Sequence, residues 1–283
     1  MDIVVVNPLV ISLNGGLGNQ LFMLFAGISK AKDENRNYLI YLEDNKRPYY
    51  FNSFMSQFYN KVLNYNSIQI STDTNNYYTE PFHHYQEIPD NCDLIKGYFQ
   101  SYKYFEHNYP YLENEFKIKE TKTNYKIGFK AIGLHFRLGD YLHLSHHHRV
   151  LSFVYYIRAI IYLKSQLSNF NEFTFLIFGE KNDDSLINDF LNQINKNLEK
   201  PLYFVKIYER FPNCKDYEEL FYMMDCNHLI MANSTFSWFG AYCNDYPDKI
   251  IVRPDDSKWF AEEVINNFNL KDLCPNNWIS IDY

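Results

Sequence analysis

The stretch Ala131-Ile132-Gly133-Leu134-His135-Phe136-Arg137-Leu138-Gly139-Asp140-Tyr141 changes from an apolar run to a polar turn within a few residues. The apolar part predicts a buried strand, and the polar segment 140–148 predicts the loop that follows it. Ligands of open α/β sheets bind where strands end in such loops. Arg137 offers a permanently charged, forked donor that suits phosphate oxygens, with His135 on the same strand face. The stretch therefore predicts a phosphate-binding strand end in an α/β sheet, and an arginine that is merely salt-bridged in a common turn is the alternative.

Apolar and amphipathic segments alternate along the chain after this stretch. They predict strands at 173–178, 202–207, 228–232 and 249–252, and helices at 150–167, 184–194, 217–225, from Ser237 onward and at 262–268. Strands that alternate with helices indicate a parallel sheet covered on both faces. Residues 126–283 are therefore predicted to form a Rossmann-like domain.

The N-terminal part begins with a related pattern. A strand-like segment, 2–13, leads into Asn14-Gly15-Gly16-Leu17-Gly18-Asn19-Gln20 and then into a helical pattern, and 38–42 is the next strand. Such a glycine turn lets backbone amides and the positive end of a helix approach an anion. The Walker and dinucleotide-binding motifs are both incomplete here, and a tight turn without a ligand is the alternative. Residues 1–125 are predicted to form a smaller α/β domain, with a boundary near Thr121 to Lys126.

Composition limits the classes of function. The chain has 283 residues and a formal net charge of −7, which argues against a general nucleic-acid or membrane-binding surface. Its start does not resemble a signal peptide, and no apolar run reaches the roughly 18 residues that a transmembrane helix needs. We therefore expect a soluble, cytoplasmic protein. The five cysteines are odd in number and lack Cys-x-x-Cys spacing, so free and mostly buried thiols are expected.

A second polar constellation, Asn233-Ser234-Thr235-Phe236-Ser237-Trp238-Phe239-Gly240, follows an apolar strand and precedes a helix. Its hydroxyls and amide surround a helix N-terminus, which favours a phosphate. Plain N-capping by Ser234 or Ser237 is the alternative. A metal site is not expected at His143 and His146–His148, because adjacent histidines in a loop do not easily converge on one ion.

Four segments together resemble the motifs of glycosyltransferase family 11, the α-1,2-fucosyltransferases. They are 15–22, 97–101 with Tyr104 and Phe105, 135–141, and 233–238; Tyr155-Tyr156 and Met223-Met224 with Cys226 also fall as in that family. The resemblance follows the order of the family's motifs and extends over nearly the whole chain.

The resemblance implies an inverting transferase of the GT-B type, an α/β fold with two Rossmann-like domains facing across a cleft. Such an enzyme moves L-fucose from GDP-β-L-fucose to a sugar hydroxyl, typically position 2 of a galactose, without a metal or other cofactor. The resemblance implies acceptor contacts within 1–125 and GDP-fucose contacts within 126–283. A lipid-linked acceptor would bring the protein to a membrane surface.

The resemblance also implies roles for individual residues. It places Arg137 and Asn19 at the donor pyrophosphate, and it assigns the rest of donor binding to His135, Gly16, Gly18, Gln20, Asn233, Ser234 and Ser237. Glu219, or less directly Glu218, would accept two hydrogen bonds from the guanine edge. The catalytic base is left open among Asp140, His143, His83, His84 and Glu87, and Asp140 is equally a structural partner of the loop.

Two departures from the family pattern stand out. Leu138 replaces a second arginine, and Gly179-Glu180-Lys181 stands where Ser-Asp-Asp is usual. Because neighbours on a strand face opposite ways, Leu138 should point away from the face of Arg137, and we expect activity to survive. The alternatives are a fucosyltransferase of another linkage, a transferase for another GDP-sugar, and an inactive glycan-binding relative.

Overall fold

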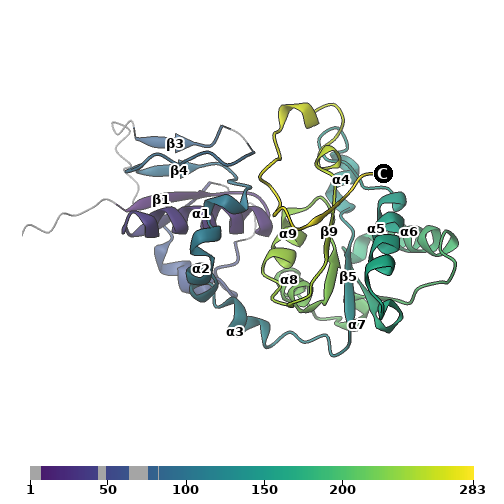
Figure 1. The fold of residues 1–283 in the computed structure, drawn as a ribbon. Helices are drawn as coiled ribbons and strands as arrows, with labels where there is room; N and C mark the ends of the chain where they lie inside the picture. Colours follow the sequence, from purple (N-terminus) through teal and green to yellow (C-terminus); the bar gives the residue numbers. More distant parts are fainter. Residues whose placement is uncertain (1–7, 44–48, 64–75, 82) are drawn as a thin grey trace, which may run out of the picture. The chain divides into compact units, whose positions relative to one another are not determined.

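The computed structural model describes residues 8–43, 49–63, 76–81 and 83–283. The chain forms two compact units, each described separately below (Figure 1). Unit 1 comprises the chain up to Thr121 together with Asn269–Pro275, and unit 2 comprises Lys122–Phe268 together with Asn276–Tyr283. The sequence placed a boundary close to the first of these transitions. It did not indicate that Asn269–Pro275 returns to unit 1.

Unit 2 is built on a six-stranded sheet in the order β10-β9-β8-β5-β6-β7, and every neighbouring pair is parallel. The strands are β5 (Ala131–His135), β6 (Thr174–Phe178), β7 (Phe204–Lys206), β8 (His228–Ile230), β9 (Ile251–Pro254) and β10 (Ile279–Ile281). The chain runs outward from β5 through β6 to β7, then returns beside β5 and runs outward the other way. This is the strand order of a Rossmann fold, whose direction reverses between β5 and β8.

Helices cover both faces of this sheet. In Figure 1, α5 (Phe153–Gln166) and α6 (Asp184–Lys196) lie on one side, and α8 (Asp216–Asp225) and α9 (Thr235–Tyr242) lie on the other. Two short helices, α4 (Gly139–His143) and α7 (Ile207–Arg210), complete the unit. Fully buried β5 residues such as Ile132 and Leu134 pack against Tyr156 and Ile160 of α5. Burial on both faces explains the nearly continuous apolar sequence of the strand.

Unit 1 holds a smaller parallel sheet in the order β2-β1-β4-β3. Its elements are β1 (Leu9–Leu13), α1 (Leu17–Asp33), β2 (Tyr38–Leu42), β3 (Tyr77–Thr79), β4 (Leu94–Lys96), α2 (Tyr109–Glu115) and α3 (Ile118–Lys122), with single 3-10 turns at Ser56–Lys61, Tyr102–Tyr104 and Glu106–Asn108. Helix α1 approaches β1 so closely at Gly27 that an added Cβ would lie 2.5 Å from Ile11 Cδ1. Phe25 on the same helix packs edge-on against Phe105, with ring centroids 5.2 Å apart.

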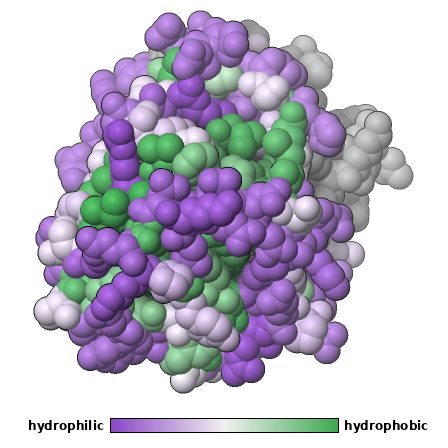
Figure 2. Space-filling model, turned by 90° about the vertical axis from the view of Figure 1, so that its right-hand side faces the viewer, coloured by the Kyte–Doolittle hydropathy of each residue, from purple (hydrophilic) through white to green (hydrophobic). Residues whose placement is uncertain are grey.

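These two parallel-sheet units confirm the predicted fold class, an α/β chain with two Rossmann-like domains. The expectation for the cysteines is confirmed as well, because all five are free and only Cys214 is not buried. Among the described residues, no helix is both long enough and apolar enough to cross a membrane. Hydrophilic residues cover most of the face drawn in Figure 2, and apolar residues gather in patches between them.

Two local expectations were wrong, and a third falls partly outside the described residues. The segment expected as a helix at 262–268 forms turns and a short 3-10 helix, Ile265–Asn267, because Phe260 and Phe268 stack with ring centroids 4.1 Å apart and fold the segment back on itself. The loop expected at 140–148 contains helix α4. The strand expected at 2–13 is described only from Leu9 onward, since residues 1–7 lie outside the described part.

Candidate functional site

Two of the predicted constellations meet at the carboxyl ends of β5 and β8, here called the β5–β8 edge. The two strands are neighbours, with Leu134 in register with Ile230, so the segments that follow them leave the sheet side by side. The ring of His135 lies near that of Phe236, with centroids 6.1 Å apart. This edge is also the place where the strand order reverses, the usual ligand position in such sheets.

His135 ends β5 and is almost fully buried. Among the described residues, its Nδ1 atom has no hydrogen-bond partner. Burial lowers the pKa of this histidine to about 3, and the positive charge of Arg137 adds to the effect. His135 is therefore a neutral imidazole at physiological pH, suited to positioning and hydrogen bonding.

Arg137 projects from the same strand end and is partly exposed. Its Nη1 lies 3.0 Å from Glu180 Oε1, and its guanidinium lies 5.2 Å from the centre of the Tyr141 ring. The salt bridge matches the alternative given for Arg137 above. Exposed ion pairs of this kind are worth at most about 1 kcal/mol. The pairing with Glu180 is therefore weak enough to be exchanged for a stronger anion such as a phosphate.

Leu138 is buried, but β5 ends at His135, so the strand alternation assumed from the sequence does not set its direction. Its side chain is 3% exposed and belongs to the apolar cluster beneath the sheet. An arginine at this position would have to leave that core before it could reach a ligand, so the residue contributes packing here.

Most polar side-chain groups of the segment 231–237 form hydrogen bonds within the protein, which leaves few of them for a ligand. Ser234 caps α9 by accepting from the Phe236 amide at 3.3 Å, and the buried Ser237 hydroxyl donates to the Ala232 and Ser234 carbonyls. Asn233 Nδ2 donates to two backbone carbonyls, while its buried Oδ1 has no partner among the described residues. The N-capping alternative therefore describes Ser234 correctly, and the amide end of α9 remains the anion-attracting feature.

Three tyrosine hydroxyls fix the backbone of this edge. Tyr156 donates to the His135 carbonyl at 3.0 Å, Tyr155 to the Met231 carbonyl at 2.7 Å, and Tyr141 to the Asn233 carbonyl at 3.1 Å. The sequence drew attention to the Tyr155-Tyr156 pair without a physical role for it. The structure supplies one, since these bonds hold the ends of β5 and β8 in place.

Glu219 on α8 belongs to the same cluster of charges. Burial, together with the negative charges of Asp216 and Glu180, raises its pKa to about 8. Glu180 therefore interacts electrostatically with Glu219 and forms an ion pair with Arg137. The neighbouring Glu218 accepts hydrogen bonds from the Lys215 amide at 2.8 Å and from the Tyr125 hydroxyl at 3.2 Å. The first of these bonds caps the N-terminus of α8, so the Glu218 carboxylate is already used within the protein. Of the two carboxyl groups named from the sequence, Glu219 is the one that makes no side-chain hydrogen bond within the described part of the chain.

Two of the candidate bases lie on the short helix α4. Asp140 lies in α4, but its side chain is outside the described part of the structure. His143, at the end of α4, is exposed. Asp183, which the sequence had noted as displaced from the family pattern, accepts from the Gly139 amide at 2.7 Å.

The glycine turn of unit 1 is held by its own side chains. Gln20, fully buried, donates to the Gly15 carbonyl at 2.8 Å, and Asn19 Oδ1 accepts from Gln100 at 3.0 Å. Gly15 has φ +76, and an added Cβ there would lie 2.9 Å from Asn19 Nδ2. Gly16 is the N-cap residue of α1 and Gly18 lies in its first turn. The structure thus joins the first two predicted motifs, 15–22 and 97–101, within unit 1.

The remaining candidates lie near the ends of β3 and β4. His83 lines a recess together with Glu43 and Glu80, whereas Glu87 is exposed and His84 does not line that recess. The sequence did not single out Glu43 or Glu80. Among the described residues, no group of three or more histidine, cysteine, aspartate or glutamate side chains is arranged to hold a metal ion.

Comparison with known proteins gives similarity to glycosyltransferases. No protein-family model matches the chain. The chain is 25% identical over 319 aligned residues to an α-1,2-colitosyltransferase of Escherichia coli, covering 96% of this chain and 98% of that protein. It is 36% identical over 153 residues to the O-antigen biosynthesis glycosyltransferase WbnK of Escherichia coli, covering 52% of this chain and 43% of that protein.

The solved structures to which the chain shows a likeness include two fucosyltransferases. The fucosyltransferase NodZ from Bradyrhizobium has a TM-score of 0.43 at 14% identity, covering 83% of this chain and 92% of that one. A mutant of Arabidopsis thaliana FUT1 in complex with GDP has a TM-score of 0.47 at 11% identity, covering 98% and 76% respectively.

Proposed function

We infer that the chain is an inverting glycosyltransferase that moves L-fucose from GDP-β-L-fucose to a glycan hydroxyl, position 2 of a galactose. The observation that carries this proposal is that the strand end bearing His135 and Arg137 and the segment leading into α9 leave neighbouring strands at the β5–β8 edge, where the His135 ring lies 6.1 Å from that of Phe236 on α9. Similarity to the colitosyltransferase over nearly the whole of both chains supports the same class of reaction. We assign donor binding to unit 2 and acceptor binding to unit 1.

Each part of the donor has a matching group at this edge. The pyrophosphate would displace Glu180 from the Arg137 guanidinium and accept hydrogen bonds from the backbone amides at the N-terminus of α9. The guanine edge would donate two hydrogen bonds to the Glu219 carboxylate. In unit 1, Gln20, Gly16 and Gly18 are assigned to the shape of the glycine turn.

The chemistry follows from where charge appears. The acceptor oxygen attacks the anomeric carbon from the face opposite the phosphate, the bond from that carbon to the phosphate oxygen breaks, and its electron pair leaves on GDP. The acceptor proton passes to a base, for which Asp140 remains the candidate in unit 2. Arg137 offsets the developing charge on GDP, a role in which loss of one donor costs about 3 kcal/mol. We propose that this arrangement needs no metal.

A second candidate is transfer of another sugar from its GDP form. The relative that matches nearly the whole chain is named for colitosyl transfer, and groups that hold phosphates do not read the sugar. A third is a glycan-binding protein without turnover.

Calorimetric titration with GDP-fucose and with GDP-mannose, both in excess chelator, tests the proposal. Micromolar binding of GDP-fucose, worth about 8 kcal/mol, should survive the chelator and should weaken by two orders of magnitude or so in Arg137→Ala. Arg158→Ala removes an exposed arginine from α5 of the same unit and should leave binding unchanged. If neither nucleotide sugar binds, the donor assignment is overturned and the glycan-binding alternative is favoured.

A further inference from the structure

A recess opens at the carboxyl ends of all four strands of the unit 1 sheet. It measures about 240 Å³, and its lining includes Asn14, Met23, Glu43, Glu80, Lys96 and Tyr98. The chain runs from β1 to β2 in one direction and later inserts β4 on the other side of β1, so the strand order reverses between β1 and β4. The recess therefore occupies the ligand position that parallel sheets favour. We call it the unit 1 recess.

Glu43 forms one polar wall of the recess. Its carboxylate accepts from the Ser12 hydroxyl, from Asn14 Nδ2 at 3.3 Å and from Lys96 Nζ at 3.1 Å. Burial opposes ionisation of Glu43, but these three donors prevail and lower its pKa. Lys96 is 55% exposed on its side of the pair. The wall thus offers a fixed carboxylate beside an ammonium and an amide.

Glu80 forms the opposite wall, and the backbone is shaped around it. Its Oε2 accepts from the Phe99 amide at 2.6 Å, which holds Phe99 at φ +50. Gly97 has φ +143, and an added Cβ there would lie 2.4 Å from Glu80 Cβ. Backbone conformations of this kind cost free energy and collect at ligand sites. Burial raises the pKa of Glu80 to about 7, so its carboxyl exchanges a proton near neutral pH.

The chemistry of the lining selects a class of ligand. The lining carries the ionised Glu43, the partly ionised Glu80 and the ammonium of Lys96, so it has no excess of positive charge to attract a phosphate group. Carboxylates, an amide and a hydroxyl suit the hydroxyls of a sugar, which both donate and accept, while Met23 and Tyr98 offer apolar surface to its C–H groups. The volume is below the roughly 300–1,000 Å³ of sites that enclose drug-sized ligands, which suits a single sugar ring.

We propose that the unit 1 recess binds one sugar ring of the acceptor glycan through Glu43, Asn14 and Lys96, with Glu80 on the opposite side of that ring. This proposal rests on the glycosyltransferase function above. It assigns acceptor recognition to a built recess in unit 1 and gives Gly97 and Phe99 the task of shaping it.

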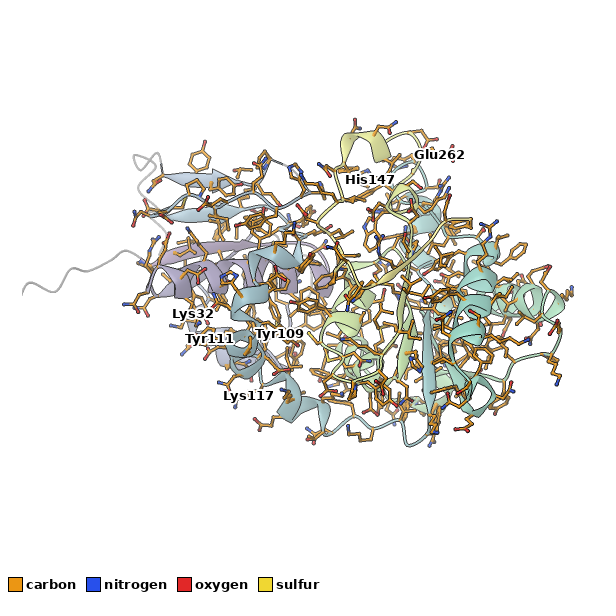
Figure 3. All side chains as sticks on the ribbon, viewed as in Figure 1. Lys32, Tyr109, Tyr111, Lys117, His147 and Glu262 are labelled. Atoms are coloured by element: carbon orange, nitrogen blue, oxygen red, sulfur yellow. The ribbon has the colours of Figure 1, made fainter. Side chains whose placement is uncertain are left out.

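A different recess in the same unit supplies a matched control. It lies around the C-terminus of α1 and is lined by Lys32, Arg36, Asn37, Lys61, Tyr111 and Glu115, among others. Lys32 lies over the Tyr111 ring, 4.9 Å from its centre (Figure 3). Because Glu115 lines a recess of unit 1 without facing Glu43 or Glu80, Glu115→Gln makes the same chemical change outside the proposed site.

The test uses the full chain and saturation-transfer NMR with methyl β-galactoside and lactose, alongside the acceptor KM and calorimetric GDP binding. Glu43→Gln should reduce saturation transfer and raise the acceptor KM about tenfold, with the affinity for GDP unchanged. Lys96→Met alters an exposed member of the wall and should act in the same direction. Glu115→Gln should match the wild type in all three measurements.

The outcomes separate this proposal from the proposed function. Unchanged saccharide binding in Glu43→Gln and Lys96→Met, or no saturation transfer to either saccharide, overturns the recess assignment while GDP binding still supports a transferase. Saccharide binding that depends on Glu43 in a protein that binds no nucleotide sugar upholds the recess and overturns the transferase.

Discussion

Replacing Glu180 by glutamine should strengthen nucleotide binding. In the structure Glu180 neutralises Arg137 across 3.0 Å, and it is one of the charges that raise the pKa of Glu219. A pyrophosphate would have to displace Glu180 from Arg137, and a guanine edge would need Glu219 ionised. Glu180→Gln keeps the size and hydrogen-bonding capacity of the side chain while removing its charge, so both obstacles become smaller.

The size of the gain follows from the exposure of the pair. Arg137 is 30% and Glu180 56% exposed, so water already screens their attraction. Pairs of this kind contribute about 0.2–1 kcal/mol, which corresponds to a fall in the GDP Kd of roughly 1.5- to 5-fold. The gain should shrink as salt rises and the Debye length shortens.

Calorimetric titration of GDP at low and at physiological salt measures this effect. Glu199→Gln is the matched control, because Glu199 pairs with Lys164 on the surface of the same unit and is 87% exposed. The control should bind GDP as the wild type does. An unchanged or weaker GDP affinity in Glu180→Gln, or an equal gain in Glu199→Gln, would refute the idea that Glu180 competes for Arg137.

Two further predictions concern the protonation of Glu219 and the packing of α1 against β1 at Gly27. The pKa of Glu219 is about 8 in the free protein, so guanine binding to its carboxylate should release close to one proton at pH 7, and GDP affinity should rise with pH up to about 8. Calorimetric titrations in buffers of different ionisation enthalpy measure the proton release. Proton release that persists in Glu219→Gln would contradict the assignment. Gly27→Ala should lower the free energy of unfolding by about 1–3 kcal/mol, since the new Cβ would lie 2.5 Å from Ile11. In Gly16→Ala the new Cβ has no atom within 4 Å, so the loss should be smaller and should reflect only the poorer capping of α1 by alanine, about 1 kcal/mol or less. Thermal melting followed by circular dichroism compares the two variants.

The sequence was most informative where burial imposes a strong pattern. The strand predicted at 173–178 is β6, Thr174–Phe178, and the helix predicted at 217–225 is α8, Asp216–Asp225. Both lie in unit 2, whose parallel sheet is covered on two faces, so their residues follow the apolar periodicity closely. Elements set by long-range contacts escaped notice. β3 and β10 each have three residues and are stabilised by pairing with one neighbouring strand.

For the candidate site too, residues in local motifs could be predicted from the sequence, whereas their distant partners could not. Arg137 and the end of α9 could be found from local motifs, because each lies directly after a buried strand. The partners of these residues could not, since Glu180 reaches Arg137 from 43 positions away in the sequence. Glu43 and Glu80 also follow strands directly, which is a usable signal. It acquires meaning only with the strand order that places both at one edge of the unit 1 sheet.

The return of Asn269–Pro275 to unit 1 affects how the two units can be exchanged with those of other proteins. The chain passes from one unit to the other after Thr121, after Phe268 and after Pro275. Asp272 in this segment pairs with Lys103 at 2.5 Å, and Leu273 is fully buried. A chimera with a single junction near Thr121 would give unit 1 a foreign partner for Lys103 and a foreign residue in place of Leu273. Recombination of the two units as intact parts therefore requires three junctions.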